Sequence, residues 1–252
     1  MAIGISQWRT SLQLAVRDIE LRYRRSLLGP FWISGVLIAT VLALAYVFSE
    51  VFGAEFVTYV AFVASGLLAW HLILALTNEA CASVTEHAAF LQNVRMPMTL
   101  IAGRIAMRNA FIFAHNVIAI VVLLVAFGAT PTLTALYAIP GVLLLLCLGY
   151  FLAIALGPLC ARFRDIPLVV QSGMQVIFFV TPIFWMPSAV GHRPMFTDSN
   201  PFFHLIELVR APLLGTLPTM LNWQVALWCC AGTAVLAVLS VTLTRKQLNL
   251  WL

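Results

Sequence analysis

The sequence predicts an all-α integral membrane protein, and three observations support this class. Hydrophobic residues make up 62% of the 252 residues, and charged residues only 9%, whereas soluble domains carry roughly 25% charged residues. Long stretches contain no Asp, Glu, Lys or Arg, among them residues 26–49 and 109–161. A helix needs about 20 apolar residues to cross the hydrocarbon core of a bilayer. We therefore predict one transmembrane domain over residues 1–252, with six transmembrane helices.

The first predicted element is a basic, amphipathic helix over residues 5–28. Its apolar residues recur at steps of three and four and share one face: Ile5, Trp8, Leu12, Ala15, Val16, Ile19, Tyr23 and Leu27. Four of its charged residues lie off that stripe: Arg17, Glu20, Arg24 and Arg25. Glu20 and Arg24 have the spacing of a helix-supporting ion pair. This pattern is typical of a helix in the headgroup plane. In the alternative interpretation, the positive charge only sets the orientation of the chain in the membrane. This would explain the arginines but not the apolar stripe.

Six predicted spans follow, separated from the first helix by Gly29 and Pro30, which suit a helix end and a helix start. They are residues 31–51, 57–78, 100–127, 134–160, 167–186 and 222–243. Residues 109–161 cannot form one helix, because it would be about 80 Å long against a bilayer core of about 30 Å. Gly128 and Pro131 divide this run.

Two segments are too polar or too broken to span. Ser83 and Glu86 fit a capping box that would start a helix over residues 84–96, and Pro97 limits its end. This helix is too short to span and too apolar for a free loop, so we expect it to dock on a partner protein. Residues 188–219 carry four prolines among Phe and Leu, which suits short re-entrant or interfacial helices.

Six spans put both termini on one side, and the basic residues indicate which side. Twelve of the 14 Arg and Lys residues fall on or near the side of the N-terminus, and only Arg193 and Arg210 fall on the other. Because cytoplasmic loops carry the excess of Arg and Lys, we expect both termini in the cytoplasm. The net charge is +5, and the basic residues behind it lie at the ends of the spans. This position suits contact with lipid headgroups rather than with nucleic acid.

The residue inventory argues against catalysis by this chain. A phosphate loop would need Gly-Lys-Ser/Thr, but Lys246 is the only lysine and Gln247 follows it. Any ATP and Mg²⁺ must therefore be bound by a separate subunit. The histidines are scattered and the cysteines lack metal spacing, so we expect no cofactor and no metal. A membrane-embedded transferase would need Asp, Glu or His clustered at one depth, and the spans lack paired carboxylates.

Amide and aromatic side chains share one face of the fifth span. These residues step by three or four, within roughly 80° of arc: Gln171, Gln175, Phe178, Pro182 and Trp185. Such groups suit a hydrated carbohydrate, and we predict that they line a channel together with Tyr46 of the first span. Helix–helix contacts through glutamine are the open alternative.

Basic residues share a face in the third span: Arg104, Arg108 and His115. Charge within a membrane is costly and indicates function by default, here the capture of a phosphorylated headgroup. The alternative for Arg104 and Arg108 is snorkelling to the interface.

Four motifs, in this order, resemble the permease subunit of ATP-binding-cassette exporters of polysaccharides, the O-antigen, teichoic acid or capsule type. They are Arg17-Asp-x-x-x-Arg-Tyr-x-x-Ser26-x-Leu-Gly-Pro-x-Trp32, Val94-Arg-Met-Pro97, Arg162-Phe-Arg-Asp165 and Asn200-Pro-x-x-x-x-Ile-Glu-x-x-Arg210. Together they extend over nearly the full chain. The form of residues 26–32 is closer to the O-antigen and teichoic acid members than to the capsule members.

The resemblance implies a homodimer in the bacterial inner membrane with two separate ATPase subunits. It implies that residues 84–96 are a coupling helix seated on the ATPase, with Glu86, Phe90, Leu91 and Arg95 as docking residues. It also implies a lipid-linked glycan substrate, undecaprenyl-pyrophosphate-linked for O-antigen. We expect five arginines to receive the pyrophosphate: Arg22, Arg24, Arg25, Arg104 and Arg108. An ATP-driven drug or haem exporter with the same six spans is the alternative, and a substrate route lined by Phe and Leu without Gln would favour it.

Overall fold

The computed structural model describes residues 2–24, 29, 31–88, 91, 96–128, 132–187 and 195–244, with side chains from Trp8 onward. Within these ranges all regular secondary structure is helical. The helices are α1 (Ala2–Tyr23), α2 (Phe31–Phe52), α3 (Phe56–Ala82), α5 (Met98–Ala126), the short η1 (Leu133–Tyr137), α6 (Ala138–Arg162), α7 (Ile166–Val180), α8 (Pro201–Leu213) and α9 (Met220–Thr244). The predicted all-α class is confirmed.

Five helical segments are long and apolar enough to cross a membrane: α2, α3, α5, η1 with α6, and α9. The predicted fifth span, 167–186, differs, because α7 ends at Val180 after 15 residues. At about 1.5 Å per residue α7 is about 22 Å long, shorter than the roughly 30 Å hydrocarbon core. Thr181 has an extended backbone, since Pro182 disfavours the helical conformation in the residue before it.

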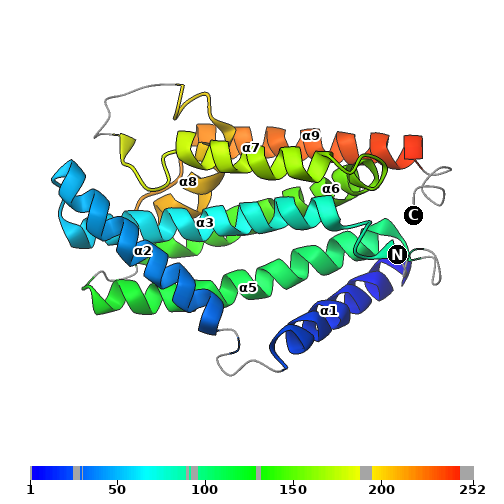
Figure 1. Ribbon diagram of the computed structural model, residues 1–252, viewed down its shortest axis with the longest axis horizontal. Coiled ribbons are helices and arrows are strands. Elements are labelled where there is room, and N and C mark those ends of the chain that lie inside the picture. Colours follow the sequence, from blue (N-terminus) through cyan, green and yellow to red (C-terminus); the bar gives the residue numbers. More distant parts are fainter. Residues whose placement is uncertain are drawn as a thin grey trace.

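Helix α3 lies at the centre of the bundle, in contact with α2, α5, α6, α7 and α8 (Figure 1). In its apolar window 72% of the residues are buried, against 22–33% in the other four spanning segments. Helix α1 begins and α9 ends at the same end of the bundle (Figure 1). We call this the terminal end, and the opposite one the far end.

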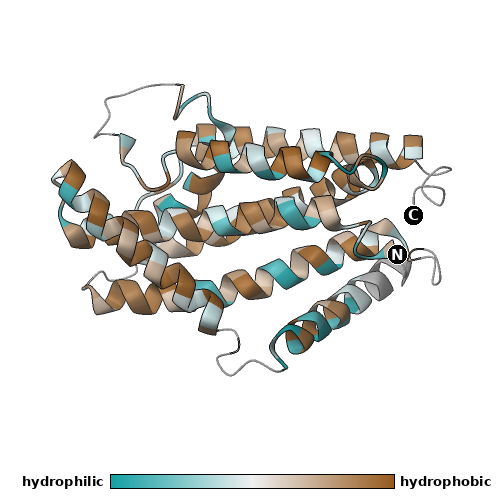
Figure 2. Ribbon diagram, viewed as in Figure 1, coloured by the Kyte–Doolittle hydropathy of each residue, from teal (hydrophilic) through white to brown (hydrophobic). Residues whose placement is uncertain are grey.

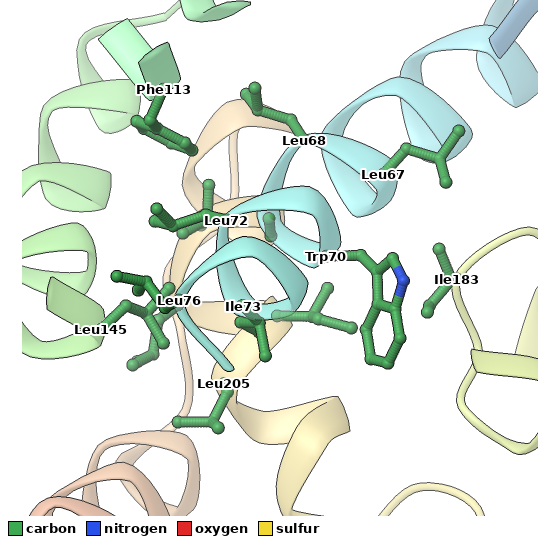
Figure 3. Packing of buried hydrophobic residues seen from close by; sticks show 14 of the residues in the cluster. Leu67, Leu68, Trp70, Leu72, Ile73, Leu76, Phe113, Leu145, Ile183 and Leu205 are labelled. Carbon is green, nitrogen blue, oxygen red and sulfur yellow. The ribbon is translucent and has the colours of Figure 1, made fainter. Parts of the chain in front are cut away.

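The core is built on the leucines of α3 (Figure 3). Leu72 lies near Phe113 of α5, and Leu76 lies near Leu145 of α6. Because lipid tails are as apolar as these side chains, close packing rather than removal from water holds such a core together. Gly141 of α6 shows how close the packing is, since an added Cβ would lie 2.7 Å from the Leu208 carbonyl oxygen of α8.

The long helices consist mostly of hydrophobic residues (Figure 2), and many of their exposed side chains are apolar. Exposed side chains include Leu143 on α6 and Trp228 and Leu243 on α9. Exposed apolar area of this extent marks a surface that another apolar phase covers, and on helices of spanning length that phase is lipid.

Residues 195–219 form the described part of the segment predicted as re-entrant. Its helix α8 is packed among α3, α6 and α9. Asn200 caps α8, since its side-chain oxygen accepts the Phe202 N–H at 3.0 Å, and Pro201 follows where an N–H is not needed. The Asn200 amide also donates to the Thr181 hydroxyl at 2.9 Å, which joins α8 to the end of α7.

Arg210 of α8 lies inside the bundle, with 1% of its surface exposed. Its guanidinium donates to Glu207 and to the Pro182 carbonyl, and it lies 4.4 Å from the centre of the Phe62 ring. Arg210 is one of the two basic residues that we expect on the outer side, and that side stays a prediction. In the structure Arg210 is an internal cation, neutralised by Glu207.

Helix α1 packs along the first half of α5 through a face of small and polar side chains. The Ser11 hydroxyl donates to the Leu100 carbonyl at 3.1 Å, and Ala15 is fully buried. Trp8 and Val16 of the predicted apolar stripe are exposed, so they are available to lipid. Glu20 pairs with Arg17 at 3.4 Å rather than with Arg24. Placement of α1 at the membrane surface stays a prediction.

Candidate functional site

The two glutamines predicted to line a channel project from the surface of α7. Gln171 and Gln175 are both exposed. No hydrogen bond to either side chain is found within the described part of the chain, so the amides join none of the described helices to another. Their exposure leaves them available to a second subunit or to a substrate.

The aromatic residues of the predicted channel differ from one another. Phe178 faces the core, with its ring centre 5.6 Å from that of Trp70. Trp185 is half-buried, and its indole N–H donates to the Phe179 carbonyl at 3.2 Å. Tyr46 on α2 is 69% exposed. Among the side chains of Phe178, Trp185 and Tyr46, that of Tyr46 is therefore the most exposed on the surface of the subunit.

Arg104 and Arg108 belong to an ion-pair network that joins three helices. Arg104 donates through Nε to Asp18 of α1 at 2.6 Å and through Nη2 to the other carboxylate oxygen. Arg108 lies 3.3 Å from Asp18 and 2.8 Å from Glu79 of α3. Asn109 also donates to Glu79, at 2.6 Å.

This network balances its charges, since two guanidinium groups face two carboxylates. The four side chains are 11–19% exposed, and buried charges need such partners. Arg104 and Arg108 are therefore held within the bundle by partners on α1 and α3. Their role in pyrophosphate binding stays a prediction, and a phosphate would have to compete with Asp18 and Glu79.

Sequence reasoning missed the acidic half of this network. Asp18 stood in the first motif without a role, and Glu79 directly follows the predicted span 57–78. A partial signal was available, because a carboxylate that is buried inside a membrane protein needs a cationic or hydrogen-bonding partner. What the sequence lacked was the pairing itself, which connects residues 86 positions apart.

The remaining predicted arginines lie at the end of α1. Arg22 and Arg24 are exposed, and Arg22 borders a cavity between α1, α2, α3 and α5. Arg25 lies outside the described residues. His71 of α3 borders the same cavity and was not predicted as a site residue.

The predicted coupling segment begins with a set of turns at residues 83–87. The capping box is wrong: Ser83 ends α3, and its hydroxyl donates to the Ala153 carbonyl of α6 at 3.1 Å. The local motif is overridden because α6 offers an acceptor at close range. Gly157 permits that approach, since an added Cβ would lie 2.2 Å from the Ser83 Oγ.

The docking residues of this segment are described in part. Glu86 is exposed and Leu91 is buried, while Phe90 and Arg95 lie outside the described residues. His87 is buried, and its Nδ1 shares a hydrogen bond with the Ser83 carbonyl at 2.9 Å. Burial and the charge of Arg104 lower the pKa of His87 below its ordinary value of 6.5, so protonation of this imidazole is disfavoured.

Comparison with known proteins agrees with this architecture. The chain is similar to the O-antigen export system permease protein RfbA of Klebsiella pneumoniae, with 25% identity over 182 residues, 70% of this chain and 69% of the relative. It is similar to the protein of the same description from Myxococcus xanthus, with 25% identity over 205 residues, 79% of this chain and 78% of the relative.

The family comparison extends over most of the chain. The model of the ABC-2 type transporter family matches residues 11–214, a range that contains the ion-pair network, the turn at 83–87 and the exposed glutamines. The chain belongs to the ABC-2 type transporter family and is a membrane subunit of a transporter.

Proposed function

We propose that this chain is the membrane-spanning subunit of an ATP-driven exporter that moves a lipid-linked polysaccharide, of O-antigen type, across the bacterial inner membrane. Two copies form the channel, two separate ATPase subunits bind ATP and Mg²⁺, and both termini lie in the cytoplasm. The observation that carries the proposal is the similarity to O-antigen export permeases over 70% or more of the chain.

The exposed amides of α7 support a glycan as the substrate. The side chains of Gln171 and Gln175 are exposed on the surface of α7, without hydrogen-bond partners in the described part of the chain. An amide group both donates and accepts hydrogen bonds, as sugar hydroxyls do. An ATP-driven drug or haem exporter is the second candidate. The exposed amides count against it, because a route for an apolar drug or for haem would not require them.

Deletion of the gene in its bacterial host tests the substrate. We expect surface polysaccharide to disappear while lipid-linked glycan accumulates inside, and plasmid-borne wild-type protein to restore export. A Gln171→Leu/Gln175→Leu protein should restore it only partly. Unchanged surface polysaccharide, with altered drug or haem sensitivity, would favour the alternative exporter.

The partner subunit is tested at the coupling segment. We expect Phe90→Ala and Arg95→Ala to abolish export while the membrane subunit still purifies as a dimer, since these side chains are proposed to contact the ATPase rather than the second copy. Co-purification of the ATPase measures the contact. Undiminished co-purification and export would remove the docking role of residues 84–96.

A further inference from the structure

Residues 181–184, which we call the bridge segment, follow α7 and are not helical although they lie inside the bundle. Thr181 has an extended backbone, and the first three residues of the segment are buried. The segment passes across α3 at Gly66, where an added Cβ would lie 3.0 Å from the Ile183 carbonyl oxygen. Gly66 is ten residues from the start of α3 at Phe56, about 15 Å along the helix axis. The bridge segment therefore lies within the depth of a hydrocarbon core of about 30 Å.

Backbone groups at this depth must be paired within the protein, since lipid offers no hydrogen bonds. Two carbonyl groups of the bridge segment accept hydrogen bonds from side chains of other helices. The Tyr59 hydroxyl of α3 donates to the Phe184 carbonyl. The Nη1 group of Arg210, on α8, donates to the Pro182 carbonyl. Both donor side chains are fully buried, so the backbone can leave the helix at this depth without unpaired carbonyl groups at these two positions.

These contacts give the fourth motif, Asn200-Pro-x-x-x-x-Ile-Glu-x-x-Arg210, a structural role. Glu207 accepts hydrogen bonds from Nε and Nη2 of Arg210, which neutralises the guanidinium and leaves Nη1 for the bridge segment. The Asn200 amide donates to the Thr181 hydroxyl at 2.9 Å. Asn200 and Arg210 therefore hold the bridge segment directly, and Glu207 holds it through Arg210.

The bridge segment also connects the two helices that carry the predicted channel residues. The centre of the Phe184 ring lies 5.4 Å from that of Phe178 of α7 and 5.0 Å from that of Phe48 of α2. Helix α7 carries the exposed glutamines, and α2 carries Tyr46 two residues before Phe48. A shift of the bridge segment would therefore change the position of α7 relative to α2.

We infer that Arg210 is a positioning residue for glycan export. With Glu207 and Asn200 it holds the bridge segment, and the segment sets how α7 and α2 lie relative to each other along the glycan route. The inference rests on the proposed function. Arginine suits this role because its planar fork serves Glu207 and the Pro182 carbonyl at once, whereas lysine carries a single ammonium group.

Hydrogen–deuterium exchange of the full-length protein in phosphatidylcholine nanodiscs tests this role, because backbone amides exchange when a segment opens. We expect Arg210→Lys and Tyr59→Phe each to speed exchange of the bridge segment about tenfold, as the loss of a buried hydrogen bond does. Exchange of α6 should stay unchanged. Tyr59→Phe nearly keeps the side-chain volume, so it tests the same segment even if Arg210→Lys lowers the yield of folded protein.

Two matched control variants make the same substitutions elsewhere. Arg17→Lys changes the exposed ion pair with Glu20. Tyr150→Phe removes a hydroxyl of α6 for which no hydrogen bond is found in the described part of the chain. Neither variant should change exchange of the bridge segment.

Export by the same variants in the deletion strain is the second measurement. We expect Arg210→Lys and Tyr59→Phe to lower the surface polysaccharide per copy of membrane subunit. Arg17→Lys and Tyr150→Phe should restore the wild-type amount. A residue that contributed only to stability would change the amount of membrane subunit and not the export per copy.

Three results would overturn the inference. Unchanged exchange of the bridge segment in Arg210→Lys would show that Arg210 does not hold it. Equally faster exchange of α6 would show that Arg210 acts on the stability of the whole bundle. Faster exchange of the bridge segment alone, with wild-type export, would show that its position does not matter to the glycan route.

The proposed function fails separately from this inference. Unchanged surface polysaccharide after deletion of the gene would reject the proposed substrate. The exchange measurement involves no glycan, so it would still decide whether Arg210 holds the bridge segment.

Discussion

At the scale of single residues, Arg17 and Arg210 form the same kind of ion pair in opposite surroundings. Each pairs with a Glu three positions away, but the Arg17 side chain is 77% exposed and the Arg210 side chain is 1% exposed. Removing one partner of a buried pair leaves an uncompensated charge, whereas water screens an exposed pair.

We therefore expect Arg210→Met to lower the free energy of unfolding by about 3–5 kcal/mol, because Glu207 and the Pro182 carbonyl both lose their donor. Arg17→Met should cost less than about 1 kcal/mol. Thermal unfolding in detergent measures both. Equal losses in the two variants would show that burial of Arg210 contributes nothing to stability.

His87 should make stability depend on pH. Its pKa in the folded protein lies below 6.5 because of burial and of Arg104, so below pH 6.5 the unfolded chain binds a proton that the folded chain resists. The stability that the neutral His87 contributes is present above the pKa that His87 has in the unfolded chain, and it is lost as the pH falls below that pKa. The unfolding temperature should drop between about pH 7 and about pH 5.5, and less so in His87→Gln. An unchanged slope in His87→Gln would exclude this residue as the cause.

At the scale of elements, polar contacts hold the helices at the terminal end together. Asp18, Glu79 and the two arginines join α1, α3 and α5, and the Ser83 hydroxyl joins the turn after α3 to α6. In an apolar surrounding such contacts specify which helices meet, since packing against lipid alone discriminates little.

Two glycines test the contact between α6 and the turn. Gly157→Ala places a methyl group against Ser83 and Val84, and such overpacking costs about 1–3 kcal/mol. Gly232→Ala on α9 meets no atom within 4 Å, and in a helix the same change should stabilise by about 0.5–1 kcal/mol. Unfolding temperatures should therefore move in opposite directions. A shift of the same sign in both variants would contradict the close approach of α6.

At the scale of the whole molecule, the bundle was predictable because a bilayer permits few structures. Backbone groups in lipid must be paired internally, so an uncharged run of sufficient length can only be a helix. The ends of the helices were less predictable. Pro182 stops α7 at Val180, and the Ser83 hydroxyl donates to α6 rather than capping a new helix. Asp18 and Arg104 could not be paired from sequence, since the contact depends on how α1 packs on α5.

The assembled transporter should place the glutamine face of α7 in water. In a protein with its five cysteines replaced, Gln171→Cys and Gln175→Cys would each be treated with a charged maleimide that does not cross membranes. The reactive species is the thiolate, which needs water to form, so we expect labelling roughly ten times faster than at Val238→Cys on the outer face of α9. Val238 is 64% exposed in the single subunit, so exposure alone does not distinguish the sites. Addition of the ATPase and ATP should change the rate at the two glutamine positions and not at Val238. Equally slow labelling at all three positions would place the amides in lipid or in a subunit contact, and the glycan would then need another path.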